Sequence, residues 1–139
     1  MKINHISTTQ LRVRYGETDQ MGYCYYGNYA QYLEVGRVEA LRLLGMSYKE
    51  MEAQGFMLPV SEFSIKYHAP AKYDDLLTIT TKIVSLEGVR LLFNYEIINE
   101  LEQKICSAAT TLVFVNKTTM RPINPPDNFK TIIAPLAYK

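Results

Sequence analysis

Several features that would place this chain in a specialised class are missing. Only two cysteines occur, Cys24 and Cys106, which are too few for a disulfide framework and lack the spacing of a metal site. No apolar run approaches the roughly eighteen residues that a membrane-spanning helix needs. Residues 1–10 (MKINHISTTQ) also lack the apolar core of a signal peptide. We therefore interpret both cysteines as reduced thiols and expect a cytoplasmic protein.

An excess of charge of one sign is missing as well. The 15 basic and 14 acidic residues give a formal net charge of +1, and no run of about five like charges occurs. This balance gives no general attraction to nucleic acid. Repeats, low-complexity segments and linkers rich in Gly, Ser or Pro are also absent. We expect a single domain over residues 1–139, with residues 1–8 and about 123–139 at its periphery.

The longest helix is predicted after a loop rich in tyrosine. Asn28, with Gln31 three residues later, resembles a capping box and predicts the start of this helix. Gly45 predicts its end as a left-handed cap. Apolar residues recur between these points at helical spacing on most sides, so the helix should be largely enclosed by other structure. A short second helix is expected over residues 47–54, with Ser47 as its cap.

Strand patterns flank this helical segment. Residues 9–16 alternate apolar and polar side chains, which predicts a strand with one wet face. The rest of the chain predicts four long strands joined by hairpin turns, at residues 57–69, 75–86, 89–99 and 104–116. This order predicts an α+β fold in which one helix is buried against one sheet. Strands this long, wrapped round one helix in so short a chain, leave one edge of the sheet open. A twofold dimer that joins two sheets would cover this edge.

Three segments share their order and spacing with a known enzyme family. They read RVRYGETDQMGYCYYGNYAQYLEVGRVEALR, SIKYHAPAKYDDLLTI and SLEGVRLLFNYEI. The first joins an aromatic residue, a Thr-Asp pair, a loop of small residues, Asn-Tyr and Glu-x-x-Arg, and the second contains Tyr-x-x-Pro-Ala-x-x-Asp-Asp. On these motifs the chain resembles the hot-dog-fold acyl-CoA thioesterases of the 4-hydroxybenzoyl-CoA thioesterase type, in their YbgC-like (Tol–Pal-associated) branch. The resemblance covers about Leu11 to Pro122.

The resemblance implies both a fold and a reaction. The fold is a long central helix wrapped by an antiparallel sheet of five to six strands. The assembly is a homodimer, often paired into a homotetramer. The reaction is hydrolysis of an acyl-CoA thioester to a free carboxylic acid and CoA, with no metal and no redox cofactor. Asp19 matches the position of the family's catalytic carboxylate.

The residues around Asp19 give this role a physical basis. A thioester carbonyl needs a nucleophile or a base that activates water, together with donors for the developing oxyanion. Asp19 lies just before the predicted helix N-terminus, where the N–H groups of Tyr26, Gly27 and Asn28 are expected to be free and to polarise a carbonyl. The alternative is a turn in which Asp19 accepts hydrogen bonds from backbone N–H groups. Glu34, on the helix, is the rival carboxylate and otherwise a supporting residue that could pair with Arg37.

Further residues are candidates for substrate contacts. Tyr15, Tyr23 and Tyr29 are expected to line the acyl pocket or to support the carboxylate, although each is also a plausible core residue. The phosphates of CoA need basic side chains near the surface, and the candidates on or beside the sheet are Lys66, Lys72, Lys82 and Arg90.

Two other functions stay open at this stage. Hydroxyacyl dehydration on the same fold usually needs a histidine beside the acid, and residues 15–45 contain none. A non-catalytic acyl-CoA-binding or partner-binding subunit is the alternative from another class. Tyr26 keeps that alternative open, because many relatives have histidine there. The two histidines of the chain, His5 and His68, are isolated in the sequence and are expected to be structural or exposed.

Overall fold

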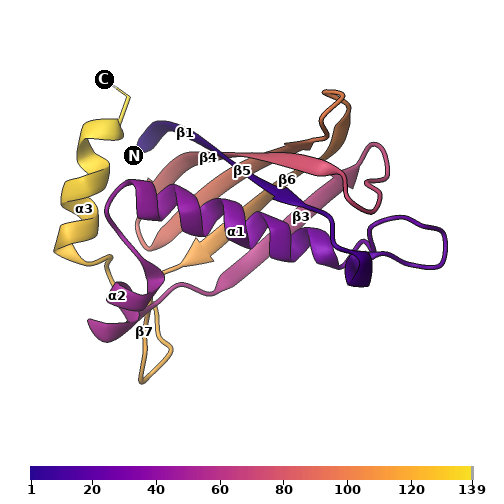
Figure 1. Cartoon of the computed structure of the whole chain (residues 1–139). Coiled ribbons are helices and arrows are strands. Elements are labelled where there is room, and N and C mark those ends of the chain that lie inside the picture. Colours follow the sequence, from indigo (N-terminus) through magenta and orange to yellow (C-terminus); the bar gives the residue numbers. More distant parts are fainter. Residues whose placement is uncertain (139) are drawn as a thin grey trace.

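In the computed structural model, which describes residues 1–138, one long helix lies across a five-stranded antiparallel sheet (Figure 1). The order across the sheet is β1-β4-β5-β6-β3. Its strands are β1 (Lys2–Arg12), β3 (Val60–Tyr67), β4 (Leu76–Glu87), β5 (Arg90–Ile98) and β6 (Lys104–Val113). The short strands β2 (Phe56–Met57) and β7 (Val115–Asn116) pair separately. The predicted α+β architecture is confirmed.

The central helix α1 (Asn28–Leu43) begins differently from the prediction. Its N-cap is Gly27, which has no side chain to cap the helix, so the predicted capping box of Asn28 is wrong. The amide of Asn28 instead donates a hydrogen bond to the carbonyl of Glu17 at 2.8 Å. The predicted end is confirmed, because Gly45 has a φ of 87° and its N–H donates to the carbonyl of Arg42 at 2.9 Å.

The second helix, α2 (Tyr48–Ala53), follows its prediction. The hydroxyl of Ser47 accepts a hydrogen bond from the N–H of Glu50 at 3.1 Å, as an N-cap residue should. Helix α2 lies beside the end of α1 in Figure 1 and leads the chain back to β3.

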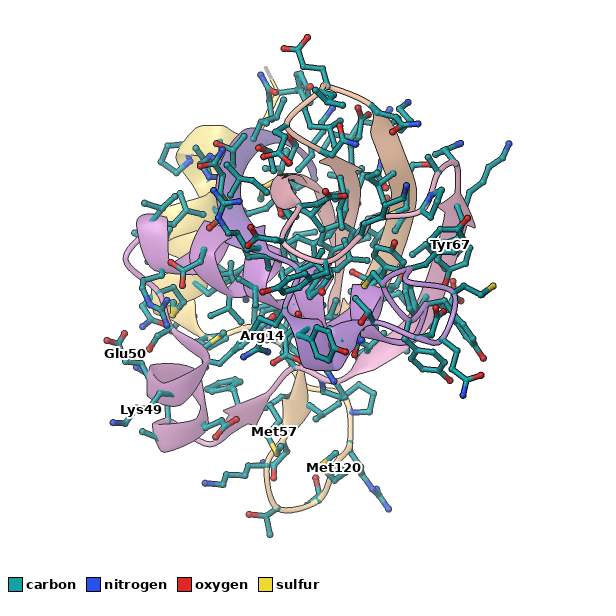
Figure 2. The ribbon with its side chains drawn as sticks, turned by 45° about the vertical axis from the view of Figure 1, so that its right-hand side comes forward. Arg14, Lys49, Glu50, Met57, Tyr67 and Met120 are labelled. Atoms are coloured by element: carbon teal, nitrogen blue, oxygen red, sulfur yellow. The ribbon has the colours of Figure 1, made fainter. Side chains whose placement is uncertain are left out.

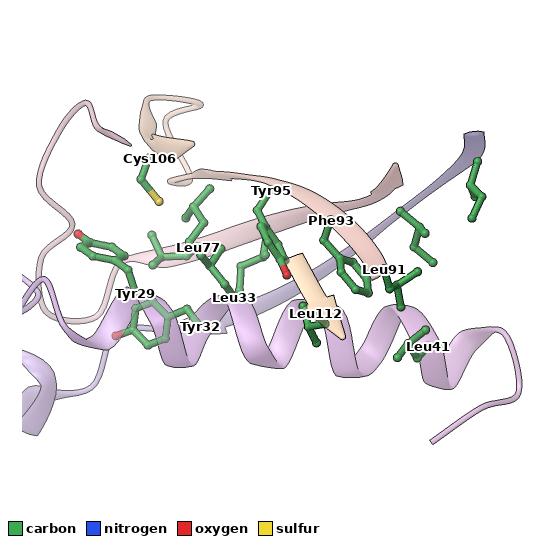
Figure 3. Close-up of a cluster of buried hydrophobic side chains, with 14 of the residues drawn as sticks. Tyr29, Tyr32, Leu33, Leu41, Leu77, Leu91, Phe93, Tyr95, Cys106 and Leu112 are labelled. Carbon is green, nitrogen blue, oxygen red and sulfur yellow. The ribbon is translucent and has the colours of Figure 1, made fainter. Parts of the chain in front are cut away.

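Helix α1 packs closely on the sheet because Gly36 faces strand β4. A methyl group at Gly36 would lie 2.6 Å from Oγ1 of Thr81 and 2.8 Å from Cγ2 of Ile79. The apolar face of α1 then meets the inward side chains of the sheet, as Figure 3 shows for Leu33, Leu41 and their neighbours. This core fixes the position of the helix N-terminus relative to the strands.

The two ends of the chain belong to this core, so their predicted peripheral placement is wrong. Strand β1 starts at Lys2, and Ile3 is fully buried. The first part of this strand was not predicted, because most of the half-buried positions of β1 are polar, such as His5 and Ser7. At the other end, helix α3 (Asp127–Ile133) and the 3-10 helix η2 (Ala134–Leu136) close one end of the sheet. The buried ring of Phe129 lies 5.0 Å from that of Phe114.

The long strands also differ at their ends from the predicted ones. Residues 57–69 divide into β2 and β3 around Pro59, and residues 104–116 divide into β6 and β7 at Phe114. Strand β1 ends at Arg12, so Tyr15 lies in the short 3-10 helix η1 (Tyr15–Glu17) rather than in a strand. Strands β1 and β3 form the two edges of the sheet. No helix within residues 1–138 has the length and apolar character to cross a membrane.

Candidate active site

Asp19 lies in the loop between η1 and α1, and the loop backbone holds its carboxylate. One oxygen, Oδ1, accepts hydrogen bonds from the N–H groups of Met21 at 2.9 Å and Tyr23 at 3.2 Å. The N–H of Asp19 donates to the carbonyl of Tyr23 at 2.8 Å, and Gly22 takes a left-handed φ of 79°. No hydrogen bond within residues 1–138 uses the second oxygen, Oδ2. The turn predicted as an alternative is therefore present, and it leaves one carboxylate oxygen free.

A cavity of about 340 Å³, called here the Asp19 cavity, opens beside this carboxylate. Its lining residues are Asp19, Met21, Tyr23, Cys24, Tyr26, Tyr29, Tyr67, His68, Ala69 and Pro70. The cavity therefore lies between the loop, the first turn of α1 and the end of β3. It brings together Asp19 with three of the predicted tyrosines.

Two free backbone donors lie at the start of helix α1, and the first of them belongs to a lining residue of this cavity, Tyr26. The N–H groups of Tyr26 and Gly27 have no hydrogen-bond partner in the described part of the chain. The third predicted donor is wrong, because the N–H of Asn28 donates to the carbonyl of Tyr25 at 2.9 Å. The free N–H groups precede the first turn of α1, where the positive end of the helix dipole lies. A carbonyl oxygen placed there would be polarised.

The half-exposed ring of Tyr25 packs against Gly27. A methyl group at Gly27 would lie 2.8 Å from Cε2 of Tyr25. The ring of Tyr25 also lies 4.8 Å from the ring of Tyr26, centroid to centroid. These contacts fix the backbone that carries the two free donors.

Glu17 connects the Asp19 loop to helix α1 through hydrogen bonds. Its side chain is 11% exposed and accepts hydrogen bonds from the backbone N–H of Arg14 at 2.9 Å and from the hydroxyl of Tyr32 at 2.8 Å. An ion pair with Arg14 at 2.8 Å lowers the pKa of this carboxyl group. Its backbone carbonyl accepts from the N–H of Tyr25 and the amide of Asn28, both at 2.8 Å. In the sequence, the only sign that Glu17 supports the site is its position two residues before Asp19.

The cysteines are not nucleophiles in this environment. Burial raises the pKa of the Cys24 thiol, and it raises the pKa of Cys106 to about 12. The Sγ of Cys24 lies 3.5 Å from the hydroxyl of Tyr32, so the thiol belongs to the same buried cluster as Glu17. Figure 3 shows Tyr29 and Tyr32 projecting from α1, with Cys106 on the facing sheet.

Two residues predicted near the site lie outside the Asp19 cavity. Tyr15 is 78% exposed and packs edge-on against Tyr73, with ring centroids 5.6 Å apart. Glu34 lines two other cavities further along α1. It forms no ion pair with Arg37 in residues 1–138, so the pairing considered from the sequence is wrong.

The residues proposed to bind CoA lie in different places. Lys72 forms an isolated β-bridge with Tyr23, at the rim of the Asp19 cavity. Lys66, beside Ser107 in the neighbouring strand, is exposed on β3. Arg90 is the first residue of β5. Tyr67 pairs with Cys106, and Cys106 pairs with Ile97 near the other end of β5, about 20 Å along the strand from Arg90. This distance argues against a contact between Arg90 and a ligand in the Asp19 cavity.

Six lining residues were missed by the sequence interpretation, and three of these carry a polar or ionisable side chain. Tyr67 contributes the wall from β3, and its ring lies 5.6 Å from that of Tyr29 and 6.4 Å from that of Tyr26. His68 shares the cavity with Asp19, and its Nε2 is 3.0 Å from the hydroxyl of Ser107. Cys24 is the third. Tyr67 is the first residue of the Tyr-x-x-Pro-Ala motif, but the motif does not show that this segment meets the Asp19 loop. That contact includes the hydrogen bond from the N–H of Cys24 to the carbonyl of Ala71 at 2.7 Å, between parts of the chain that are distant in sequence.

Comparisons with known proteins identify the family. The sequence model of the Thioesterase-like superfamily matches residues 13–133. The protein YneP of Bacillus subtilis is 34% identical over 119 residues, 86% of each chain. The acyl-CoA thioester hydrolase YbgC of Escherichia coli is 33% identical over 124 residues, 89% of this chain and 90% of YbgC. The chain belongs to the thioesterase-like superfamily.

Solved structures agree with this assignment. A DHNA-CoA thioesterase from Staphylococcus aureus is similar with a TM-score of 0.88 and 32% identity, covering 91% of this chain and 87% of that one. The hot-dog fold and the family predicted from the three sequence segments are thereby confirmed.

Proposed function

We propose that this chain hydrolyses acyl-CoA thioesters to a free carboxylic acid and CoA at the Asp19 cavity. The observation that carries the proposal is a carboxylate with one free oxygen in the same cavity as Tyr26, whose backbone N–H is free and adjoins the free N–H of Gly27 at the helix N-terminus. The names of the relatives that cover most of the chain support the same substrate class.

The proposed chemistry starts with the thioester carbonyl lodged at the helix end. Its oxygen accepts hydrogen bonds from the N–H groups of Tyr26 and Gly27, which stabilise the developing negative charge. Asp19 either removes a proton from an attacking water or attacks the carbonyl carbon itself. Direct attack would form a mixed anhydride that water then cleaves. In both cases the carbon–sulfur bond breaks and CoA leaves as a thiolate, which later takes up a proton.

This scheme needs no histidine at position 26. Thiols have pKa values of about 8.5, so a thiolate leaves without prior protonation. Tyr26 therefore contributes its backbone N–H, and its side chain forms part of the wall. Lys66, which precedes Tyr67 on β3, and Lys72, which bridges to Tyr23, are the basic residues proposed to meet the phosphates of CoA.

We also propose that the working unit is a homodimer, with pairing into a homotetramer as a further step. Strand β3 is an edge strand, and its apolar side chains are unusually open, with Phe63 45% and Tyr67 48% exposed. Twofold pairing of two β3 edges would cover these side chains and close the cavity wall that contains Tyr67. The cytoplasmic location expected from the sequence stays a prediction.

The test is thiol release from short-chain, long-chain and aromatic acyl-CoA esters by the wild type, Asp19→Asn and Glu34→Gln. Asparagine keeps the oxygen that accepts from Met21 and Tyr23, so the turn should survive. We expect Asp19→Asn to lower kcat by about a hundredfold or more at an unchanged Tm. Glu34→Gln should retain activity.

The same assay distinguishes the second candidate, a non-catalytic acyl-CoA-binding subunit. If no ester is hydrolysed but acyl-CoA raises the Tm, the chain binds without turnover. Equal rates for the wild type and Asp19→Asn would contradict the role of Asp19 and make Glu34 the next residue to test.

A further inference from the structure

Three cavities follow one another along helix α1, the first two in the seam between α1 and edge strand β3 and the third beside α2 and β2. Helix α1 and strand β3 run in opposite directions, because Tyr29 at the start of α1 lies against Tyr67 at the end of β3. The Asp19 cavity occupies this first end of the seam. A second cavity of about 260 Å³ follows, and apolar side chains such as Leu33 from α1 and Phe63 from β3 form much of its wall.

Arg37 closes the far end of the second cavity. The same residue also lines a third cavity of about 220 Å³, which extends to Tyr48 and Met57. Figure 2 shows Tyr67 and Met57, which line the first and the third cavity, well apart. The seam therefore leads from the Asp19 cavity, over an apolar stretch, to an arginine.

The positive charge of Arg37 lacks a counter-ion in the described part of the chain. Its side chain is 9% exposed, it takes part in none of the ion pairs there, and its Nε has no hydrogen-bond partner. The groups beside it are the phenols of Tyr48 and Tyr95, which are neutral. The hydroxyl of Tyr48 is also buried without a hydrogen-bond partner.

A buried guanidinium in this state is costly unless an acceptor reaches it. Glu34, one turn earlier on α1, lines both cavities but is exposed and forms no ion pair with Arg37. No carboxylate within residues 1–138 pairs with Arg37, so a negatively charged group that enters the seam would be its first counter-ion. An arginine fork at the end of an apolar cavity fits a carboxylate carried on an apolar chain.

We propose that the second cavity holds the acyl chain of the substrate and that Arg37 binds a carboxylate at the far end of that chain. This inference rests on the proposed thioesterase function, because the chain starts at the carbonyl held by Tyr26 and Gly27. Arg37 follows Gly27 by about 15 Å along the helix axis. Side chains of a helix lean toward its N-terminus, which shortens this distance. The substrate class is thus the CoA thioesters of medium-length dicarboxylic acids.

The test compares pairs of CoA esters of equal chain length that end in a methyl group or in a carboxylate. Octanoyl-CoA is paired with suberoyl-CoA, and decanoyl-CoA with sebacoyl-CoA. In the wild type, kcat/KM for the carboxylate-ended ester should exceed that of its partner by roughly tenfold to a hundredfold. Arg37→Met should abolish this preference, mainly through a higher KM. Arg42→Met, an exposed arginine of the same helix that pairs with Glu39, should keep it.

A second variant and a binding measurement keep the test decisive. Arg37→Lys keeps the charge but loses the planar guanidinium, so we expect an intermediate preference for the carboxylate-ended ester. Arg37→Lys also takes the place of Arg37→Met if the methionine variant fails to fold. Calorimetry with non-hydrolysable thioethers of CoA, carrying the same two chain ends, measures the preference without turnover. If no ester is hydrolysed, the thioesterase function fails, and the thioether affinities alone decide the role of Arg37.

Three results would overturn the inference. Equal kcat/KM for the two members of each pair would show that Arg37 does not sense the chain end, while the thioesterase function stands. The same conclusion follows if Arg37→Met slows the hydrolysis of both esters equally. In that case a bound water, and not the substrate, pairs with the guanidinium of the wild type. Loss of the dimer in Arg37→Met would assign its counter-ion to a second copy of the chain.

Discussion

The hydroxyl of Tyr32 donates a hydrogen bond of 2.8 Å to Oε1 of Glu17 and thereby ties helix α1 to the loop that carries Asp19. Tyr32 is nearly fully buried, so this bond is shielded from water. The backbone of Glu17 also accepts from Tyr25 and Asn28, on either side of the free N–H groups. Glu17 therefore contacts both the segment that carries Asp19 and the segment that carries the two free N–H groups.

The first prediction concerns this bond. Tyr32→Phe should lower the free energy of unfolding by about 1.5–3 kcal/mol, because it leaves a buried carboxylate oxygen without its donor. Glu17→Gln keeps an oxygen that can accept from Tyr32 but loses the charge that pairs with Arg14, so it should cost less. Both should also lower kcat more than they raise KM, since the carboxylate and the donors move apart. In a double-mutant cycle, the Glu17→Gln/Tyr32→Phe protein should lose less than the sum of the single changes. Strict additivity in stability and in kcat would contradict the coupling.

The pH dependence of stability gives a second prediction. The ion pair with Arg14 holds the pKa of Glu17 below its ordinary value of 4.5 in the folded protein. A carboxyl group with a lowered pKa contributes its full stability above the pKa of the unfolded chain. It loses that contribution as the pH falls through the lower folded pKa. The difference in Tm between the wild type and Glu17→Gln should be constant near neutral pH and should shrink in acid below about pH 4. A difference that is independent of pH down to strong acid would contradict this assignment.

Much of the fold was predictable because its signals are local. The helix end at Gly45, the cap at Ser47 and the alternation of β5 each depend on neighbouring residues, and the structure confirms them. Strand β1 was missed at its start because its half-buried positions are largely polar. Periodicity depends on apolar contrast, and this strand has little.

The candidate site was predictable only in part for a related reason. Asp19, Tyr26 and Gly27 lie close together in the sequence, so one motif contains them. Tyr67 reaches them through contacts between distant segments, such as the hydrogen bond from the N–H of Cys24 to the carbonyl of Ala71, which no local pattern encodes. The N–H of Asn28 was wrongly predicted to be free, because the turn before the helix gives it a partner in Tyr25.

Gly36 supports a third prediction, on packing. Gly36→Ala places a methyl group within 2.8 Å of side-chain atoms of both Ile79 and Thr81, which lie on a sheet that cannot yield easily. The free energy of unfolding should fall by about 1–3 kcal/mol, measured by denaturant titration. Gly16→Ala is the matched control, because nothing lies within 4 Å of a methyl group there and its φ is not left-handed. Equal effects at the two glycines would argue against the close contact of α1 with β4.

The last prediction tests how two copies of the chain associate. If two β3 edges pair about a twofold axis, residues near the middle of β3 lie close to their own copies, and like charges there repel. Ser64 is exposed near the middle of that strand, whereas Asn4 is exposed on β1 at the opposite edge. Ser64→Lys should therefore shift the protein from dimer toward monomer in light scattering, and Asn4→Lys should leave the dimer intact. The monomer should also lose thioesterase activity, because the cavity wall at Tyr67 would stay open to solvent. The reverse result, with Asn4→Lys dissociating the dimer and Ser64→Lys leaving it whole, would place the interface on the β1 edge instead.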